Sequence, residues 1–561
     1  MSGGTPVPPA LDPAVWPAST RVGADGAVSV GGVDLRALAA EHGTPAYVLD
    51  EGDFRARARG FRTAFEAAFA PLGVGVDVYY AGKAFLSVAV ARWAHEEGLR
   101  IDTSTGGELA VALRAGVPGV DIGLHGNNKS DAEIERALRA GVGRVVIDSL
   151  GEVDRVADVA ARLGVRAPVM VRVTTGVHAG GHEYISTAHE DQKFGLSVTG
   201  GQALAALRAV VERPELELLG IHSHIGSQIL DPSGFEVAAQ RVMELRAELA
   251  ALTGHLVPEV DLGGGFGIAY VPGDVPLDPE RVAKDTARTV GDVCARLGTA
   301  VPRISIEPGR AIVGPTTLTL YTVGTVKPVT VSGTGEGEDL VRTYVSVDGG
   351  MSDNLRPALY GADYTAAVVS RPADARTVPA RVVGKHCESG DVVVRDVELP
   401  ADVASGDLLA VPATGAYGRS MASNYNHVPR PPVVAVRDGA TRVLVRRETE
   451  DDLLALDLGL RPASTGGTRP TRARARPYPG QRPAAHAPGR RSEERWPGCQ
   501  SPTARCASPC SDAVSSARRW PGSCSRKART SRRVSARGSS WSVSPCATRR
   551  SRATRWSTRR C

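Results

Sequence analysis

The feature that most constrains this 561-residue chain is a regular alternation of apolar and amphipathic segments between residues 74 and 306. The apolar segments are short and rich in Val, Ile and Leu, which is typical of buried parallel strands. They lie at residues 74–80, 99–102, 120–125, 144–148, 168–173, 218–222, 260–262 and 304–306. Amphipathic segments of helical length separate most of them, at residues 85–97, 106–115, 131–140, 151–163, 200–212, 234–253 and 278–297. The alternation predicts an α/β fold.

Eight strands alternating with helices predict a (β/α)8 TIM-type barrel. A doubly wound sheet would show the same alternation, because periodicity does not reveal strand order. The residues at the strand ends favour the barrel, since barrel enzymes build their sites at the carboxyl ends of the strands. Residues capable of chemistry follow almost every strand: Lys83, Asp102, His125, Asn127, Asn128, Asp148, Arg172, His222, His224, glycines 263–265, Glu307 and Arg310.

The segments on either side of the barrel have a different character. Residues 1–27 are rich in Pro, Gly and Ala at the start and are expected to be flexible, and short strands are expected within 28–50. After the barrel, assigned to 51–310, residues 311–460 contain short β-branched runs separated by Gly, Asp and Pro. This pattern predicts an antiparallel β-barrel or sandwich, which the strands of 28–50 would join.

Residues 461–561 form a basic, low-complexity tail. They hold 24 of the 67 Lys and Arg residues, only 3 of the 61 Asp and Glu residues, and six of the eight cysteines. No hydrophobic period is sustained, so we expect this tail to be disordered, or to be a spurious extension such as the product of a shifted reading frame. A basic arm that binds nucleic acid is the alternative.

Composition excludes several classes of protein for the first 460 residues. They carry 43 basic and 58 acidic side chains, so no basic face for nucleic acid is expected. Cys294 and Cys387 are the only cysteines there, too few for a disulfide framework or a zinc site. No secretory signal and no apolar run long enough to span a bilayer is visible. We therefore expect a cytoplasmic protein without a membrane partner.

Residues 78–84, with the sequence Val-Tyr-Tyr-Ala-Gly-Lys-Ala, form a strand that ends at a lysine. Burial disfavours an ammonium ion, so a lysine held there would be the nucleophilic amine that a Schiff base needs. The ordinary alternative is that Lys83 only extends its charge to water.

Two other strand ends carry groups suited to a phosphorylated ligand. Residues 261–267 read Asp-Leu-Gly-Gly-Gly-Phe-Gly, a loop whose backbone N–H groups could wrap phosphate oxygens, although a plain tight turn fits equally well. Glu307 and Arg310 belong to a Glu-Pro-Gly-Arg sequence, which places a carboxylate beside a phosphate-binding or carboxylate-binding guanidinium. His222 and His224 lack a third zinc ligand at useful spacing, so no metal is expected.

Together these groups are the parts that pyridoxal phosphate requires: a Schiff-base lysine, a phosphate loop, a planar group to stack on the ring and a carboxylate for the pyridine nitrogen. The sequence resembles the diaminopimelate decarboxylase family of the alanine-racemase-like (fold type III) enzymes from about residue 45 to 456. The motifs that carry the resemblance are YYAGKAF, DTSTGGEL, LHGNNKS, EDQKFGLS, HSHIGSQ, DLGGGFG, EPGR, DGGMSDNLRPALY, KHCESGD and ATGAY.

The resemblance implies roles for the cofactor-binding residues. Lys83 would carry pyridoxal 5'-phosphate as a Schiff base, His224 would stack on its ring, and Glu307 would hydrogen-bond its pyridine nitrogen. The phosphate would be held by Ser227, Gly265, Gly309 and Arg310. Tyr417 would reach both the cofactor and the substrate.

The resemblance also implies how substrate is bound. The residues that would contact it are Arg310, Arg356, Tyr360, Glu388 and Tyr417. Cys387 would donate the proton to Cα. Cys387 and Glu388 would come from the neighbouring subunit, which implies an obligatory homodimer with shared active sites.

The implied reaction is decarboxylation of meso-2,6-diaminopimelate at its D centre to L-lysine and carbon dioxide, the last step of lysine biosynthesis. Arg310 and Arg356 suit the distal carboxylate of this substrate, and Glu388 suits its distal ammonium. A decarboxylase of the same fold acting on another basic amino acid or a carboxylated polyamine is the nearest alternative. A catalytically inactive, cofactor-binding regulator is the alternative from another class.

Overall fold

The computed structural model of the chain describes residues 6–7, 11–177, 193–331 and 340–460. The basic tail predicted at 461–561 lies outside the described residues, as does part of the flexible segment predicted at 1–27.

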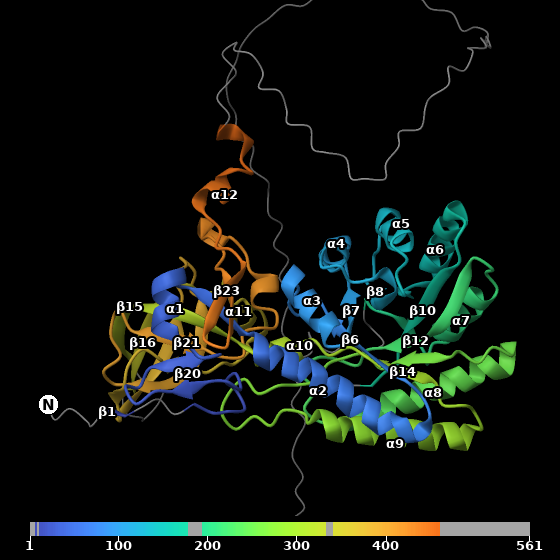
Figure 1. The fold of residues 1–561 in the computed structure, drawn as a ribbon, viewed down its shortest axis with the longest axis horizontal. Coiled ribbons are helices and arrows are strands. Elements are labelled where there is room, and N and C mark those ends of the chain that lie inside the picture. Colours follow the sequence, from blue (N-terminus) through green and yellow to red (C-terminus); the bar gives the residue numbers. More distant parts are fainter. Residues whose placement is uncertain (1–5, 8–10, 178–192, 332–339, 461–561) are drawn as a thin grey trace, which may run out of the picture. The chain divides into compact units, whose positions relative to one another are not determined.

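Eight parallel strands close into a barrel, which confirms the predicted architecture and excludes a doubly wound sheet (Figure 1). The ring closes where the last strand pairs with the first, with Ile304 opposite Val76. In order around the ring the strands are β6 (Val76–Ala81), β7 (Arg100–Thr103), β8 (Ile122–Leu124), β9 (Arg144–Ile147), β10 (Ala167–Thr174), β12 (Leu216–Ser223), β13 (Glu259–Asp261) and β14 (Arg303–Ile306). A two-residue strand, β11 (Leu196–Ser197), pairs in parallel with the end of β10 and is not part of the ring.

Helices accompany the barrel strands (Figure 1), and all but the first lie where the amphipathic segments predict them. They are α2 (Glu51–Phe69), α3 (Val88–Glu96), α4 (Gly106–Arg114), α5 (Asp131–Arg139), α6 (Leu150–Leu163), α7 (Gln202–Val211), α8 (Ser233–Thr253) and α9 (Pro279–Leu297). Helix α5 shows the local rules: a capping box of Ser130 and Glu133 begins it, and it buries Ile134, Ala137 and Leu138 on one face.

The barrel interior contains a buried arginine instead of a purely apolar filling. Arg144 on β9 is 1% exposed, and its guanidinium carbon lies 3.5 Å from the ring centre of Tyr79 on β6. It forms ion pairs with Glu259 at 3.1 Å and with Asp261 at 2.5 Å, both on β13. A buried charge is tolerated only when it is paired, so these contacts fix one charged layer inside the barrel.

The second domain is a nine-stranded sheet that includes a strand from before the barrel. Its main path is β20 (Val392–Pro400), β19 (Thr377–Val383), β16 (Leu340–Val347), β15 (Thr317–Val331), β5 (Ala46–Asp50), β22 (Val433–Arg437) and β23 (Ala440–Val445). Two strands lie off this path, β17 (Ala367–Val368) and β21 (Leu408–Val411). Most pairings are antiparallel as predicted, but β5 pairs with β22, and β16 with β19, in parallel.

Smaller elements complete the described chain. A three-stranded sheet is formed by β2 (Arg21–Val22), β3 (Val28–Val30) and β4 (Val33–Asp34), and helix α1 (Leu35–His42) follows it. Strand β1 (Pro6–Val7) pairs with β18 (Ala373–Asp374). Near the end of the described residues lies a short helix, α12 (Glu450–Leu454).

The sheet domain contacts the barrel directly beside the predicted Schiff-base lysine. The backbone N–H of Tyr417 and the hydroxyl of Ser420 both donate to the carbonyl oxygen of Ala84, each at 2.9 Å. Asp50, the last residue of β5, caps helix α2 by accepting a hydrogen bond from the backbone N–H of Asp53 at 3.0 Å. The rim of the barrel at Lys83 is therefore fixed against the sheet domain.

Within the described residues, none of the helices combines the length and the apolar character needed to cross a membrane.

Candidate active site

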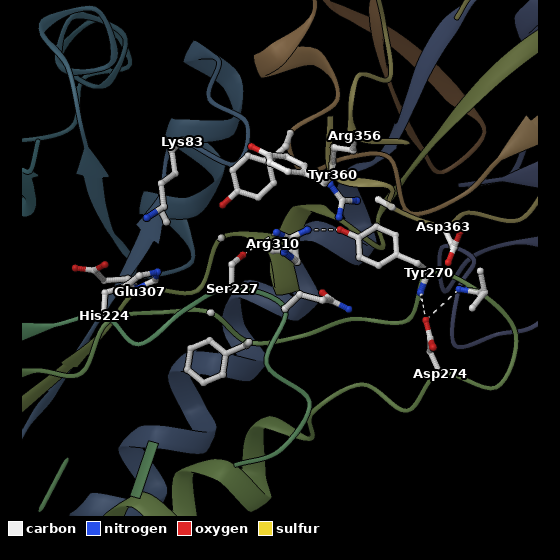
Figure 2. Close-up of a pocket in the computed structure, with 18 residues that line it drawn as sticks. Lys83, His224, Ser227, Tyr270, Asp274, Glu307, Arg310, Arg356, Tyr360 and Asp363 are labelled. Atoms are coloured by element: carbon white, nitrogen blue, oxygen red, sulfur yellow. Dashed lines mark hydrogen bonds between the residues drawn. The ribbon is translucent and has the colours of Figure 1, made fainter. Parts of the chain in front are cut away.

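A cavity of about 370 Å³ lies at the carboxyl ends of the barrel strands, where the sheet domain meets them. It brings together residues that are far apart in the sequence. Ten of the twelve predicted site residues line it: Lys83, His224, Ser227, Gly265, Glu307, Gly309, Arg310, Arg356, Tyr360 and Tyr417. Figure 2 shows Lys83, His224 and Glu307 at one end and Tyr270, Asp274 and Asp363 at the other, with Ser227 and Arg310 between them.

Lys83 lies two residues after the end of β6 and lines two neighbouring cavities. The expectation of a buried lysine is wrong, because the side chain is exposed. The reason is its position: Lys83 follows the end of β6 at the rim of the barrel and is exposed between the buried residues Gly82 and Ala84. The amine is consequently accessible to a ligand from both cavities.

The second cavity, of about 310 Å³, shares Ala81, Lys83, His224 and Glu307 with the first. Other strand-end residues surround it: Asp102, Ser104, His125, Asn127, Arg172 and His222. The barrel thus gathers most of the strand-end residues that the sequence singled out around one lysine.

Glu307 is a buried carboxylate flanked by two imidazoles. Its Oε1 lies 3.0 Å from Nε2 of His222 and 3.4 Å from Nε2 of His125. Burial alone would raise the pKa of Glu307, but the attraction of His222 and His125 outweighs it and holds that pKa well below its usual value. The carboxylate is therefore ionised, and the two imidazoles fix its orientation. The ligand atoms of these three residues also lie within 4.8 Å of one another, close enough to hold a metal ion.

Burial lowers the pKa values of two histidines at this site, His125 and His224. Burial lowers the pKa of His125 to about 4, and its Nε2 lies 3.0 Å from Oδ1 of Asp102. Burial and the nearby charge of Lys83 hold the pKa of His224 well below its usual value. His224 accepts a hydrogen bond at Nδ1 from the backbone N–H of Gly264 at 3.1 Å, so its ring is held next to the glycine loop.

The glycine loop after β13 packs too closely against neighbouring backbone to carry side chains at two of its positions. A Cβ atom on Gly265, whose φ is +109°, would lie 2.4 Å from the carbonyl oxygen of Gly226. A Cβ atom on Gly264 would lie 2.2 Å from the carbonyl oxygen of Glu307. Only glycine fits at these positions, and the loop presents bare backbone to the cavity as a phosphate-binding loop does.

Arg310 begins the short helix α10 (Arg310–Val313) and connects the two ends of the cavity. Its Nη2 donates to Oγ of Ser227 at 2.7 Å, and its Nη1 donates to the hydroxyl of Tyr270 (Figure 2). The guanidinium carbon also lies 4.8 Å from the ring centre of Tyr417. Arg310, Ser227, Gly265 and Gly309 line the same cavity, so they could hold a phosphate group.

Arg356 supplies a second guanidinium from the sheet domain. It begins helix α11 (Arg356–Tyr360), is 6% exposed, and its Nη1 donates to the hydroxyl of Tyr364. Tyr360, at the end of the same short helix, also lines the cavity. The end of the cavity away from Lys83 can therefore bind a carboxylate group of a ligand, separate from any group of that ligand at Lys83.

Cys387 and Glu388 lie elsewhere on the surface of the described chain. Both are exposed, and neither is among the residues that line the cavity of their own chain. The backbone N–H of Cys387 donates to Oδ1 of Asn426 at 3.1 Å, which holds this turn in place.

Tyr270, Asp274, Asp363 and Tyr364 were not identified from the sequence. The first three line the cavity, and the hydroxyl of Tyr364 accepts a hydrogen bond from Arg356. The available signal was the position of Tyr270, three residues after the glycine-rich motif.

The side chains of the cavity fit pyridoxal phosphate by the chemistry of their donors. An accessible amine, a neutral imidazole, an ionised buried carboxylate and a glycine cradle with an arginine face one space. These are the groups that a cofactor with an aldehyde, an aromatic ring, a pyridine nitrogen and a phosphate requires.

Comparison with known proteins gives the same picture. Residues 51–314 match the family described as the pyridoxal-binding domain of pyridoxal-dependent decarboxylases. The chain is 53% identical over 455 residues to a diaminopimelate decarboxylase of Mycobacterium tuberculosis, covering 80% of this chain and 98% of the relative. It is 44% identical over 448 residues to the diaminopimelate decarboxylase of Bacillus subtilis, with the same shares covered.

Solved structures show the same likeness in three dimensions. The crystal structure of diaminopimelate decarboxylase from M. jannaschii in co-complex with L-lysine matches with a TM-score of 0.71 at 32% identity. The match covers 78% of this chain and 98% of that one.

Proposed function

The chain belongs to the pyridoxal-dependent diaminopimelate decarboxylases, and we propose that its barrel-mouth cavity converts meso-2,6-diaminopimelate to L-lysine and carbon dioxide. The observation that carries this proposal is one cavity with Lys83 and Glu307 at one end and two arginines toward the other. An alternative decarboxylase of ornithine or arginine would have no use for a second cationic group, because those substrates lack a distal carboxylate.

Pyridoxal 5'-phosphate, when bound, supplies an electron sink for the pair of electrons left when a carboxylate departs. We propose that Lys83 holds the aldehyde carbon of the cofactor and that His224 lies against its ring. Ser227, Gly265, Gly309 and Arg310 would hold the phosphate. Tyr417, whose ring lies beside the guanidinium of Arg310, would contact the cofactor from the side of the sheet domain.

Glu307 is proposed to hold a proton on the pyridine nitrogen. It can do so because its own pKa is held low, against burial, by His222 and His125. An ionised carboxylate in a buried site favours a positive charge on its partner. A carboxylate with a lowered pKa at this position would stabilise a proton on the pyridine nitrogen.

The distal carboxylate of the substrate is proposed to bind Arg356 and Arg310, with Tyr360 beside them. Binding of that carboxylate would direct the opposite, D centre toward Lys83. Orientation of this kind lowers the barrier by fixing the reacting bond before the chemical step.

The protonation step requires a second copy of the chain. We propose that Cys387 of one copy donates a proton to Cα in the site of the other, and that Glu388 binds the distal ammonium there. The exposed position of both residues outside their own cavity supports this arrangement. The sharing of Cys387 and Glu388 between copies leads us to propose a homodimer. Because a donor thiol must remain reduced, we also propose that the enzyme is in the cytoplasm.

The test measures carbon dioxide release from meso-diaminopimelate, ornithine and arginine by the wild type and by Lys83→Ala. We expect turnover of meso-diaminopimelate alone, and no turnover by the variant. Borohydride reduction of the cofactor-loaded wild type should label the peptide that contains Lys83. Turnover of ornithine or arginine in place of meso-diaminopimelate, or a label on a different lysine, would refute the proposal.

A further inference from the structure

We propose that Tyr270 is a positioning residue that holds Arg310 and Arg356 at the spacing that a distal carboxylate requires. This inference rests on the proposed function, and it adds a determinant of substrate choice. Tyr270 is 6% exposed and lies on the segment between the glycine loop and α9. Figure 2 shows its ring beside Arg310 and Arg356 in the cavity.

One tyrosine contacts both guanidinium groups. The hydroxyl of Tyr270 accepts a hydrogen bond from Nη1 of Arg310. The guanidinium carbon of Arg356 lies 4.3 Å from the centre of the same ring, and that of Arg310 lies 5.8 Å from it. Arg310 belongs to the barrel and Arg356 to the sheet domain, so Tyr270 joins the two cations across the domain boundary.

Two guanidinium groups in one cavity repel each other while no anion is bound. The face of an aromatic ring carries negative charge and attracts a cation, which offsets part of this repulsion. Nη1 of Arg310 donates to the hydroxyl of Tyr270 and Nη2 donates to Ser227, so these two contacts fix the orientation of the guanidinium. Nε of Arg310 remains buried without a hydrogen-bond partner among the described residues, so a donor is left for a ligand.

Tyr270 is itself held in place by its surroundings. Oδ2 of Asp274 accepts hydrogen bonds from the backbone N–H groups of Tyr270 at 2.9 Å and of Val271 at 3.2 Å (Figure 2). The ring packs edge-on against Tyr364 with the ring centres 5.1 Å apart. Tyr364 in turn accepts a hydrogen bond from Arg356. The two tyrosines thus form a fixed support for the two arginines.

The consequence concerns which ligands the site distinguishes. L-lysine and cadaverine differ only by the carboxylate that the arginines would bind. A ligand with that carboxylate benefits from the spacing that Tyr270 maintains, and a diamine does not. Tyr270 therefore acts on the preference for an amino acid end and not on the chemistry at Lys83.

The experiment measures dissociation constants of L-lysine and cadaverine for the cofactor-loaded enzyme, together with kcat and KM for meso-diaminopimelate. Tyr270→Phe keeps the ring and removes the hydroxyl. We expect its dissociation constant for L-lysine and its KM to rise about tenfold, the size of one hydrogen bond to a charged group. The dissociation constant for cadaverine and kcat should stay within about twofold. Tyr344→Phe, in strand β16 and outside the cavity, is the matched control.

A second variant covers the possibility that the first perturbs the fold. Tyr364→Phe removes the acceptor of Arg356 without touching the cavity lining, and should raise the dissociation constant for L-lysine in the same selective way. Equal weakening of L-lysine and cadaverine, or unchanged L-lysine binding in both variants, would overturn the inference. If instead the wild type does not decarboxylate meso-diaminopimelate, the proposed function fails, and that outcome is distinct.

Discussion

Around Glu307, buried negative charge exceeds buried positive charge. Asp102, Asp261 and Glu307 are buried carboxyl groups, and Arg144 is the guanidinium that contacts all three. Burial and the neighbouring Glu307 raise the pKa of Asp102 well above its usual value. A positively charged pyridine ring next to Glu307 would reduce this excess, so the cofactor completes the charge balance of the barrel mouth.

The lowered pKa of His125 predicts a specific sensitivity to acid. Its pKa is about 4 in the folded chain against 6.5 for an ordinary histidine, so the unfolded chain binds more protons between these values. Stability conferred by the neutral ring is complete above about pH 6.5 and falls as the pH drops toward 4. Between pH 7 and pH 5, the free energy of unfolding of the wild type should therefore fall by about 2 kcal/mol more than that of His125→Asn.

Urea unfolding of the cofactor-free proteins at the two pH values measures this difference. His427→Asn, an exposed histidine, is the control and should keep the acid sensitivity of the wild type. Identical losses in the wild type and in His125→Asn would contradict the assignment.

The glycine-rich segment after β13 makes a prediction at the scale of an element. Gly265 and Gly273 both have positive φ values, +109° and +93°, but only a Cβ atom on Gly265 would collide with backbone. Gly265→Ala should lower the affinity for pyridoxal phosphate at least about tenfold, because the phosphate cradle must shift. Gly273→Ala has open space and should cost only about 1 kcal/mol of stability, from backbone strain.

Fluorescence titration of each cofactor-free variant with pyridoxal phosphate, and its melting temperature, distinguish the two effects. Equal cofactor affinities in Gly265→Ala and Gly273→Ala would show that the cradle at Gly265 does not hold the phosphate.

The barrel strands were predictable because their signal is local. Each is a short apolar run, and each ends in polar residues that the closed ring then collects at one rim. The parallel pairing of β5 with β22 was not predictable, because Val48 and Val434 are distant in sequence and no local pattern encodes their register. The sequence pattern also did not predict which strands are neighbours within the sheet domain.

Among site residues, the sequence identified groups whose chemistry is distinctive but not those that act through packing. Lys83, Glu307 and Arg310 are recognisable as an amine, a carboxylate and a guanidinium at strand ends. Tyr270 is an ordinary aromatic residue in the sequence, and only its contacts with two arginines give it significance. The exposure of Lys83 likewise depends on how the rim opens, which a single strand does not reveal.

At the scale of the whole molecule, a shared active site predicts complementation between inactive variants. In a mixed dimer of Lys83→Ala and Cys387→Ala, one site carries both defects and the other carries neither. Random exchange of subunits should therefore restore about a quarter of the wild-type activity, since half of the dimers are mixed and each has one intact site.

The matched control mixes Lys83→Ala with Arg356→Ala. Both residues line the cavity of their own chain, so every site in this mixture retains one defect and no activity should return. Absence of recovery in the first mixture, with exchange of subunits verified by mass spectrometry, would argue against a site shared between copies.

The basic tail gives a second prediction at this scale. A protein ending at residue 460 should keep kcat/KM for meso-diaminopimelate within about twofold, because all residues of the cavity precede that point. Loss of turnover on truncation would assign the tail a role in the enzyme.

Strand β5 pairs on one edge with β15 and on the other with β22, and it is followed at once by α2. During synthesis its partners emerge only after the ribosome has made the entire barrel, and the second of them only near residue 433. A nascent chain must therefore carry an apolar strand with two open edges for most of its translation. Halting translation within the barrel should leave a species prone to aggregation through residues 46–50, which is the cost of placing one strand of the sheet so early in the gene.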